Sequence, residues 1–220
     1  MIKTIIFDLG GIFIQIDTKQ SLQKICDRLH SMSIEDILNI LIRSDHYLQY
    51  EKGFIDSHMF YERVKRDMGG NFSFGFFEKV WQQIFSPIQP MIDLLPQFKT
   101  RYQLVLLSNT NVLHMEYIEK HFPFFHYFDH IIYSYRVGMI KPDIKIFHYT
   151  LKKIRARAKD CVFIDDTIEN IRAAETLGIR SYQFIFPHYI QISDEECIRC
   201  PIQHVLLDHS NMKDNGIGLI

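Results

Sequence analysis

An aspartate stands at the end of the first apolar run of the sequence. Asp8 follows residues 2–7, which are rich in β-branched and aromatic side chains and too few to cross a membrane. Such a run predicts a buried strand with Asp8 at its carboxyl end, where open α/β sheets bind their ligands. A carboxylate in that place can act as a nucleophile, although a lone Asp-x-Gly-Gly segment is more typical of a turn.

Two further apolar runs also end in polar residues. Ser108 and Asn109 follow one of them, and a hydroxyl and an amide at the end of a buried strand are suited to hold an anion. Asp165 and Asp166 follow the other. Two adjacent unpaired carboxylates are costly at the end of a buried strand, and a bound divalent cation removes that cost.

These residue types together meet the needs of phosphoryl transfer through an aspartyl-phosphate. A carboxylate that attacks phosphorus meets like charge, unless a hard cation such as Mg²⁺ bridges the nucleophile and the phosphate. We expect Asp8 and Asp166 to hold that ion. The Ser108 hydroxyl, backbone N–H groups near Asn109 and the ammonium of Lys141, which stands in a loop, are expected to stabilise the transferring group.

The pattern of elements predicts an α/β fold that brings these segments together. From about residue 90 onward helical and strand patterns alternate, which is typical of a parallel sheet covered by helices. Before residue 90 an all-helical insert is predicted. The predicted strands after the first are 103–108, 130–134, 160–165 and 180–185, and the predicted helices are 18–30, 33–43, 57–68, 73–86, 90–99, 111–120, 143–154 and 168–177.

Composition narrows the class of protein. The 220 residues are 47% hydrophobic, enough for a full core, and the net charge of -1 has no basic stripe, so neither nucleic acid nor a membrane is an expected partner. Four scattered cysteines and the absence of a signal-peptide pattern predict a cytoplasmic protein. The segment with Cys197, Cys200, His204 and His209 is interpreted as a surface helix with two thiols and not as a zinc site. The oligomeric state is not indicated.

Four motifs in a fixed order resemble those of the haloacid dehalogenase-like hydrolase superfamily, and the resemblance covers most of the chain. They are residues 7–11, 107–110, 141–143 and 163–167, the last followed by Asn170. The resemblance implies a Rossmann-like core with a helical cap inserted after the first motif. It thus implies a core of residues 1–14 and 91–220 and a cap of residues 15–90.

The resemblance also implies roles for the site residues. Asp8 is implied as nucleophile and metal ligand, and Lys141 as the partner of both the nucleophile and the phosphate. Asp166 is implied as the direct ligand of Mg²⁺, with Asp165 supporting it. Ser108 and Asn109 are implied to bind the phosphate of a small phosphorylated substrate, whereas Asp143 in the third motif is expected to be only an acid in the first turn of a helix.

Gly10 departs from the family pattern. Phosphatases of this family usually have a second aspartate two residues after the nucleophile, which protonates the leaving group and then activates water. The backbone carbonyl of Gly10 can still bind the metal, as the family uses it, but the general acid is missing. Loss of such assistance typically costs about 10²- to 10⁴-fold in rate.

Four functions are compatible with Gly10 to different degrees. The favoured one is a phosphatase whose leaving group needs little help, such as that of a sugar 1-phosphate or an acyl phosphate. Residues 50–53 and the Asp-Leu-Gly form of the first motif are similar to a subgroup with sugar-1-phosphate phosphatases and the amino-terminal domain of soluble epoxide hydrolases. A degenerate, non-catalytic binder of a phosphorylated ligand or a protein is the alternative. A dehalogenase tolerates Gly10 but leaves Asp165 and Asp166 unexplained, and Gly10 argues against a phosphomutase.

Aromatic and histidine residues are frequent in the predicted cap. Most are expected to pack between helices, and one or two to face the ligand. A histidine can replace the missing acid, and the candidates are His46, His58 and His114. The aromatic and histidine residues considered in the cap are His46, Tyr47, Tyr50, Phe54, His58, Phe60, Tyr61 and Trp81.

Overall fold

A parallel sheet is the centre of the computed structural model, which describes residues 1–29 and 32–184. Its order is β5-β4-β1-β6-β7, and every neighbouring pair is parallel. The inner strands β1, β4 and β6 are buried almost throughout, as long apolar runs require. The α/β prediction is therefore confirmed. The strands are β1 (Thr4–Phe7), β4 (Gln103–Ser108), β5 (His130–Tyr133), β6 (Cys161–Asp165) and β7 (Arg180–Gln183).

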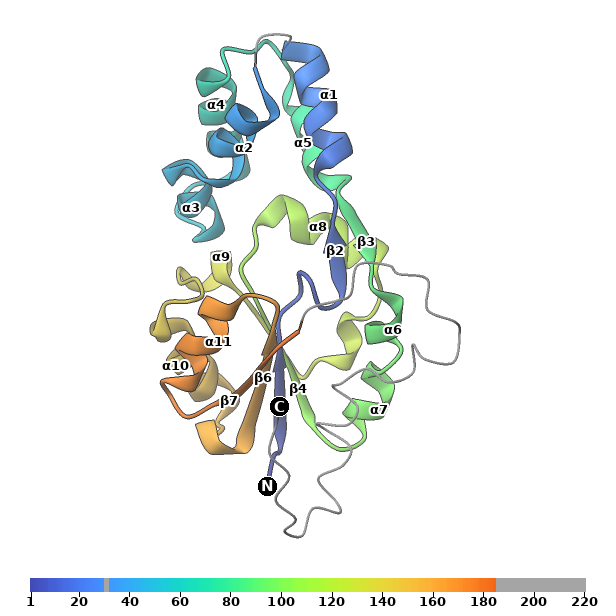
Figure 1. Ribbon diagram of the computed structural model, residues 1–220, viewed down its shortest axis with the longest axis vertical. Coiled ribbons are helices and arrows are strands. Elements are labelled where there is room, and N and C mark those ends of the chain that lie inside the picture. Colours follow the sequence, from blue (N-terminus) through green and yellow to red (C-terminus); the bar gives the residue numbers. More distant parts are fainter. Residues whose placement is uncertain (30–31, 185–220) are drawn as a thin grey trace, which may run out of the picture. The chain divides into compact units, whose positions relative to one another are not determined.

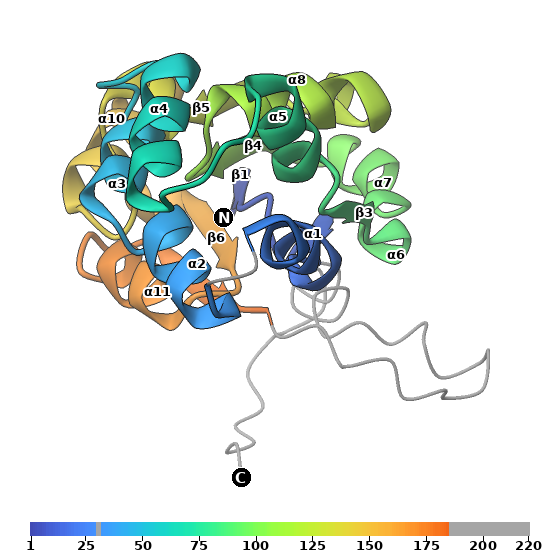
Figure 2. The same cartoon turned by 90° about the horizontal axis from the view of Figure 1, so that it is seen from above.

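Helices lie on both faces of this sheet. Helices α10 (Ile144–Ile154) and α11 (Ile168–Glu175) are on one face, and α6 (Gln89–Ile92) and α7 (Leu95–Lys99) are on the other (Figures 1 and 2). The single helix predicted over 90–99 is wrong, because Pro96 lies in the first turn of α7, where its missing N–H ends the ladder of α6. The remaining elements after β4 are α8 (Val112–His121), η1 (Phe125–Tyr127), α9 (Ser134–Val137) and η2 (Ala158–Asp160).

Five helices between β2 and β3 form what we call the helical segment. Polar caps begin several of them; Ser33, for example, accepts from the backbone of Asp36 and Asp36 accepts from that of Ser33. Ser44 likewise caps α3, a helix that the apolar pattern did not predict. Aromatic side chains fill the core of the segment, with Tyr50 and Phe60 stacked at 4.6 Å. The five helices are α1 (Lys19–Leu29), α2 (Ile34–Ile42), α3 (Asp45–Glu51), α4 (Ser57–Asp67) and α5 (Phe74–Gln82).

A two-stranded antiparallel ladder leads into and out of the helical segment. It pairs β2 (Ile14–Ile16) with β3 (Phe85–Pro87). The sequence predicted a helix as far as residue 86, which is wrong because α5 ends at Gln82. A proline disfavours the helical conformation of the residue before it, here Ser86.

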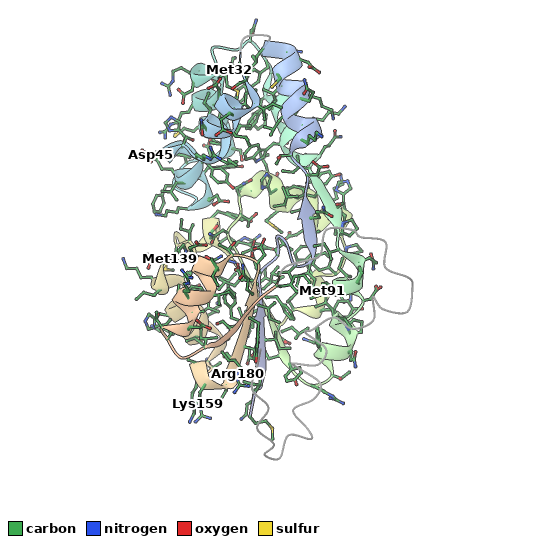
Figure 3. The ribbon with its side chains drawn as sticks, in the orientation of Figure 1. Met32, Asp45, Met91, Met139, Lys159 and Arg180 are labelled. Atoms are coloured by element: carbon green, nitrogen blue, oxygen red, sulfur yellow. The ribbon has the colours of Figure 1, made fainter. Side chains whose placement is uncertain are left out.

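The two ends of the parallel sheet differ. Lys159 and Arg180 lie at the end where β6 and β7 begin, whereas Met139, two residues before Lys141, lies towards the other end (Figure 3). The polar residues that follow β1, β4 and β6 therefore meet at one edge. No helix in the described ranges is long and apolar enough to span a membrane. The predicted thiol segment, with Cys197 and Cys200, lies outside the described residues.

Candidate active site

Three carboxylates meet at the carboxyl ends of β1 and β6. Because Phe7 pairs with Ile164, the next residues Asp8 and Asp165 are neighbours, and the Asp8 N–H donates to the Ile164 carbonyl at 2.9 Å. Asp8, Asp165 and Asp166 each have an oxygen within 4.8 Å of the other two. Residues that are more than 150 positions apart in the sequence thus share one site.

Lys141 lies between two of these acids. Its Nζ is 2.8 Å from Asp8 Oδ1 and 2.6 Å from Asp165 Oδ2, and the residue is only 2% exposed. Burial acts to lower the pKa of the ammonium, but the charges of Asp8 and Asp165 outweigh it and the pKa is raised. Lys141 is therefore a fixed cation beside the Asp8 carboxylate.

The Asn109 side chain holds Lys141 in this position. Its Nδ2 donates to the Lys141 carbonyl and its Oδ1 accepts from the Lys141 N–H, both at 2.8 Å. The expected binding of phosphate by Asn109 stays a prediction, and the side chain has in addition this role of holding Lys141. Ser108 is 3% exposed, and its hydroxyl donates to the Asn109 carbonyl at 3.3 Å. Asn111, and not Ser108, is the N-cap residue of α8, so helix capping does not explain the position of Ser108.

Asp165 and Asp166 have different surroundings. Asp165 is fully buried and accepts from the Thr167 N–H at 2.8 Å and from Asn170 Nδ2 at 3.0 and 3.1 Å, in addition to Lys141. Asp166 is exposed as a residue. Its carboxyl is nevertheless partly buried, and this partial burial together with the charge of Asp165 raises its pKa. Asp165 is thus saturated with partners, while Asp166 has oxygen atoms left for a ligand.

The donor set fits a hard cation. Burial raises the pKa of Asp8 to about 7, Lys141 opposes the shift, and Asp165 adds to it. A divalent cation lowers the pKa of a carboxylate that binds it, which removes the cost of ionising Asp8 there. Carboxylate and carbonyl oxygens are the ligands that Mg²⁺ prefers, and Asp8 and Asp166 supply the carboxylates.

Gly11 is a site residue whose role the sequence did not predict. Its φ is +67°, and a Cβ on it would lie 2.3 Å from Asp166 Oδ2. Only glycine both adopts this conformation readily and leaves room for the Asp166 carboxylate. The two successive glycines after Asp8 were the available signal, but only the position of Gly10 was interpreted.

Ser134 and Asn170 also support the site. The buried Ser134 hydroxyl accepts from the Thr110 N–H and donates to the Thr110 carbonyl, both at 2.9 Å, which holds the loop after β4. Asn170 holds Asp165, as described above. Asn170 could be found from its place after the fourth motif, whereas no pattern connects Ser134 with Thr110. Asp143 caps α10 by accepting from the Lys145 N–H at 2.9 Å, a structural role at the start of that helix.

A cavity of about 360 Å³ adjoins the site and contains Leu9, Gly10, Ser108 and Asn109 in its wall. The rest of the wall comes from the helical segment, β2, β3, the loop after β4 and α8. Of the aromatic and histidine residues considered in the predicted cap, Tyr47 and Trp81 line this cavity, and the others do not. That one or two of these residues face a ligand stays a prediction, and Tyr47 and Trp81 are the candidates.

The three candidate histidines differ in position. His46 Nε2 is 3.2 Å from Asp67 Oδ2, and His58 stacks on Phe74 at 4.7 Å; neither lines the cavity. His114 does line it, but burial lowers the pKa of this imidazole to about 3. The His114 imidazole is therefore neutral near pH 7 and does not serve as a cationic general acid.

The chain matches a known protein family and several characterised relatives. Residues 2–178 match the family described as haloacid dehalogenase-like hydrolase. The chain belongs to this family. A D-ribitol-5-phosphate phosphatase of Bacteroides thetaiotaomicron is 25% identical over 190 residues, which cover 83% of this chain and 92% of the relative. A sesquiterpene phosphatase of Aspergillus oryzae is 28% identical over 186 residues, which cover 80% and 87%.

A solved structure extends the likeness. The crystal structure of a haloacid dehalogenase family enzyme of Bacteroides thetaiotaomicron, in complex with magnesium and inorganic phosphate, superposes with a TM-score of 0.76. The two sequences are 28% identical, and the likeness covers 86% of this chain and 98% of that chain. The fold of the haloacid dehalogenase-like hydrolase described here is thus that of an enzyme known to hold both magnesium and phosphate.

Proposed function

We propose that the protein is a magnesium-dependent phosphatase that hydrolyses a small phosphorylated metabolite. The observation that carries this proposal is the position of Asp8, which lies within salt-bridge distance of Lys141 and in one cluster with Asp165 and Asp166. A buried carboxylate beside a fixed ammonium is arranged to meet an anionic phosphoryl group. Family membership and the named activities of the relatives support the same reaction.

Asp8 is proposed as the nucleophile. One oxygen of its carboxylate attacks phosphorus, and the bond from phosphorus to the leaving oxygen breaks, which leaves an aspartyl-phosphate. The leaving oxygen takes up a proton from solvent, because Gly10 offers no acid. Water then attacks the phosphorus, gives up a proton to solvent and breaks the bond from phosphorus to Asp8, which releases inorganic phosphate and the Asp8 carboxylate. Throughout, the Lys141 ammonium and the Ser108 hydroxyl are proposed to stabilise the phosphoryl oxygens. The hydrogen bonds of Lys141 with Asn109 and Asp165 support this role for the lysine.

Asp8, Asp166 and the Gly10 carbonyl are the proposed ligands of Mg²⁺. When bound, the ion neutralises charge between the nucleophile and the phosphate. Asp166 suits this role because it is exposed and carries few internal hydrogen bonds, whereas Asp165 is fully engaged. A magnesium requirement also separates this enzyme from a dehalogenase.

We further propose that residues 15–90 form a cap over a core whose described part is residues 1–14 and 91–184. Two contacts support this: the Leu113 N–H donates to Tyr50 Oη at 3.3 Å, and Gly53 approaches Tyr135 so closely that a Cβ would lie 2.1 Å from its carbonyl oxygen. A cap that closes excludes bulk water during phosphoryl transfer. A cytoplasmic location is proposed on the free thiols of Cys26 and Cys161.

Gly10 favours one second candidate, a binder of phosphorylated ligands that no longer turns them over. Without the usual acid at this position, a poor leaving group departs slowly. An aryl phosphate needs no such acid, so it separates the two functions. We expect magnesium-dependent hydrolysis of p-nitrophenyl phosphate, abolished in Asp8→Asn and retained in the control Asp93→Asn, whose exposed side chain lies at the C-terminal end of α6. Magnesium binding without turnover of any phosphate ester would refute the phosphatase.

A further inference from the structure

The cavity beside the site has a predominantly hydrocarbon wall. Its apolar members come mainly from β2, which is labelled in Figure 1, and from α1, α2 and α5, whose places can be followed in Figure 2. Its volume of about 360 Å³ lies at the lower end of the range for small-molecule sites, about 300–1,000 Å³. Representative apolar side chains of the wall are Ile16, Leu22, Leu38, Leu41, Ile42 and Trp81.

The polar side chains of the wall are mostly engaged with the protein itself. The Tyr47 hydroxyl donates to Glu51 at 2.6 Å, and the amide of Asn109 is paired at both ends. Ser21 Oγ and His114 Nε2 have no hydrogen-bond partner among the described residues, but both atoms are occluded. A ligand rich in hydroxyl groups would leave most of them without partners, at a cost for each one.

Two apolar side chains of the wall are exposed. Ile16 is 52% and Ile42 is 41% exposed, although both line a cavity that also contains Gly10 and Ser108. A hydrocarbon ligand that covers them removes apolar surface from water, which is favourable at about 25 cal/mol per Å². The same cavity therefore joins an apolar surface to the residues proposed to bind phosphate.

Resting on the proposed phosphatase function, we infer that the substrate is a phosphomonoester of a small, hydrocarbon-rich alcohol and not of a polyol. The phosphate lies at Asp8 and Ser108, and the alkyl, alkenyl or aryl part of the leaving group occupies the cavity. The hydroxyls of Thr18 and Thr110, for which the described residues supply no hydrogen bond, and the Glu51 carboxylate, which accepts from Tyr47, leave room for only a few polar groups in that part. Specificity then comes from apolar contact and from the shortage of free polar partners.

A pair of substrates with equal numbers of carbon atoms tests the inference. Pentyl phosphate and ribitol 5-phosphate differ by the hydroxyl groups of the chain. Both are esters of primary alcohols, so the missing acid at Gly10 slows the two reactions alike, and we expect kcat/KM to be at least tenfold higher for pentyl phosphate. Along the series of n-alkyl phosphates, each added methylene that is buried is expected to raise kcat/KM about threefold to fourfold until the cavity is full. A flat series, or preference for ribitol 5-phosphate, would overturn the inference.

Two isoleucines of α2 provide a matched pair of variants. Ile42 lines the cavity and Ile34 does not, yet both are 41% exposed. Ile42→Ser is expected to lower kcat/KM for pentyl phosphate by about threefold to tenfold, with a smaller effect on methyl phosphate. Ile34→Ser is expected to change neither, and equal effects of the two variants would count against the apolar subsite.

Failure of the phosphatase function can be told apart from failure of this inference. Turnover of p-nitrophenyl phosphate shows that the enzyme is active whichever alcohol it prefers. The cavity is tested without turnover by calorimetry with pentylphosphonate, which is not hydrolysed. We expect magnesium-dependent binding with a negative heat-capacity change, weakened in Ile42→Ser and not in Ile34→Ser. Absence of binding in an enzyme that hydrolyses the aryl ester overturns the inference alone.

Discussion

Replacing Gly11 by alanine is expected to disable the metal site, whereas the same change at Gly10 is expected to preserve it. Gly11 has a φ of +67°, where a side chain costs about 1–2 kcal/mol. Its added Cβ would lie 2.3 Å from Oδ2 and 2.9 Å from Cβ of Asp166. Because the overlap includes that Cβ, rotating the carboxylate does not relieve it, and one of the two loops must move.

The size of the effect follows from these distances. Ordinary contact begins at 3.4 Å, so Asp166 must shift by about 1 Å relative to Gly11. A misplacement of about 1 Å at a reacting centre costs about 10²-fold in rate. We therefore expect Gly11→Ala to lower kcat/KM by about 10²-fold and the free energy of unfolding by about 1–3 kcal/mol. At Gly10 a Cβ would meet only Ile16 Cδ1 at 3.5 Å, and a change within about 1 kcal/mol is expected.

Urea unfolding and magnesium titration of p-nitrophenyl phosphate hydrolysis measure both quantities for the two variants. Gly11→Ala is expected to need more Mg²⁺ for half-maximal activity than the wild type, because Asp166 is displaced. Gly10→Ala is the matched control, since it adds the same methyl group to the preceding residue. Wild-type magnesium dependence in Gly11→Ala, or equal damage in Gly10→Ala, would refute the reasoning.

Three further predictions concern the neighbouring residues. Because the pKa of Asp8 rises from 3.8 to about 7 on folding, the folded state binds more protons than the unfolded state between these pH values. The metal-free protein should therefore lose stability as the pH rises through this window, which thermal unfolding in EDTA measures. Asp8→Asn should reduce that slope, to which Asp166 and Glu51 still contribute because their pKa values are also raised, and an unchanged slope would contradict the assignment. Asp165→Asn should lower the free energy of unfolding by about 3–5 kcal/mol, because it breaks a buried ion pair. Asp166→Asn, by contrast, should mainly weaken magnesium binding. Equal losses of stability of the two variants in urea would argue against this difference. Tyr50→Phe should cost about 1 kcal/mol in the same measurement, because the Leu113 N–H loses its acceptor, and no loss would show that this contact is not needed.

Much of the sheet could be predicted because its strands are long apolar runs. The expected ranges for β4 and β6 agree with the structure to within one residue. Several short elements escaped the pattern. Among them, α3 depends on its cap at Ser44, and β3 depends on pairing with β2. Neither signal is a periodicity over many residues, and periodicity is what such predictions detect.

The candidate site was predictable to the extent that its chemistry lies in residue types at strand ends. Asp8, Lys141, Asp165 and Asp166 were expected to gather, and they do. Their proposed roles in catalysis stay predictions that the variants above test. The pairing of Asn109 with the Lys141 backbone was not foreseen, because a side chain and a main chain that are 32 residues apart share no sequence pattern.

By itself, the sequence determined the class of fold and which acids stand at strand ends, because hydrophobic runs and the polar residues after them are local features. It also determined that Gly10 offers no acid. Only the tertiary structure decided why Gly11 must be glycine and that a largely apolar cavity adjoins the site. Both depend on distances between segments that are far apart in the chain, and the order of strands and the packing of helices set those distances.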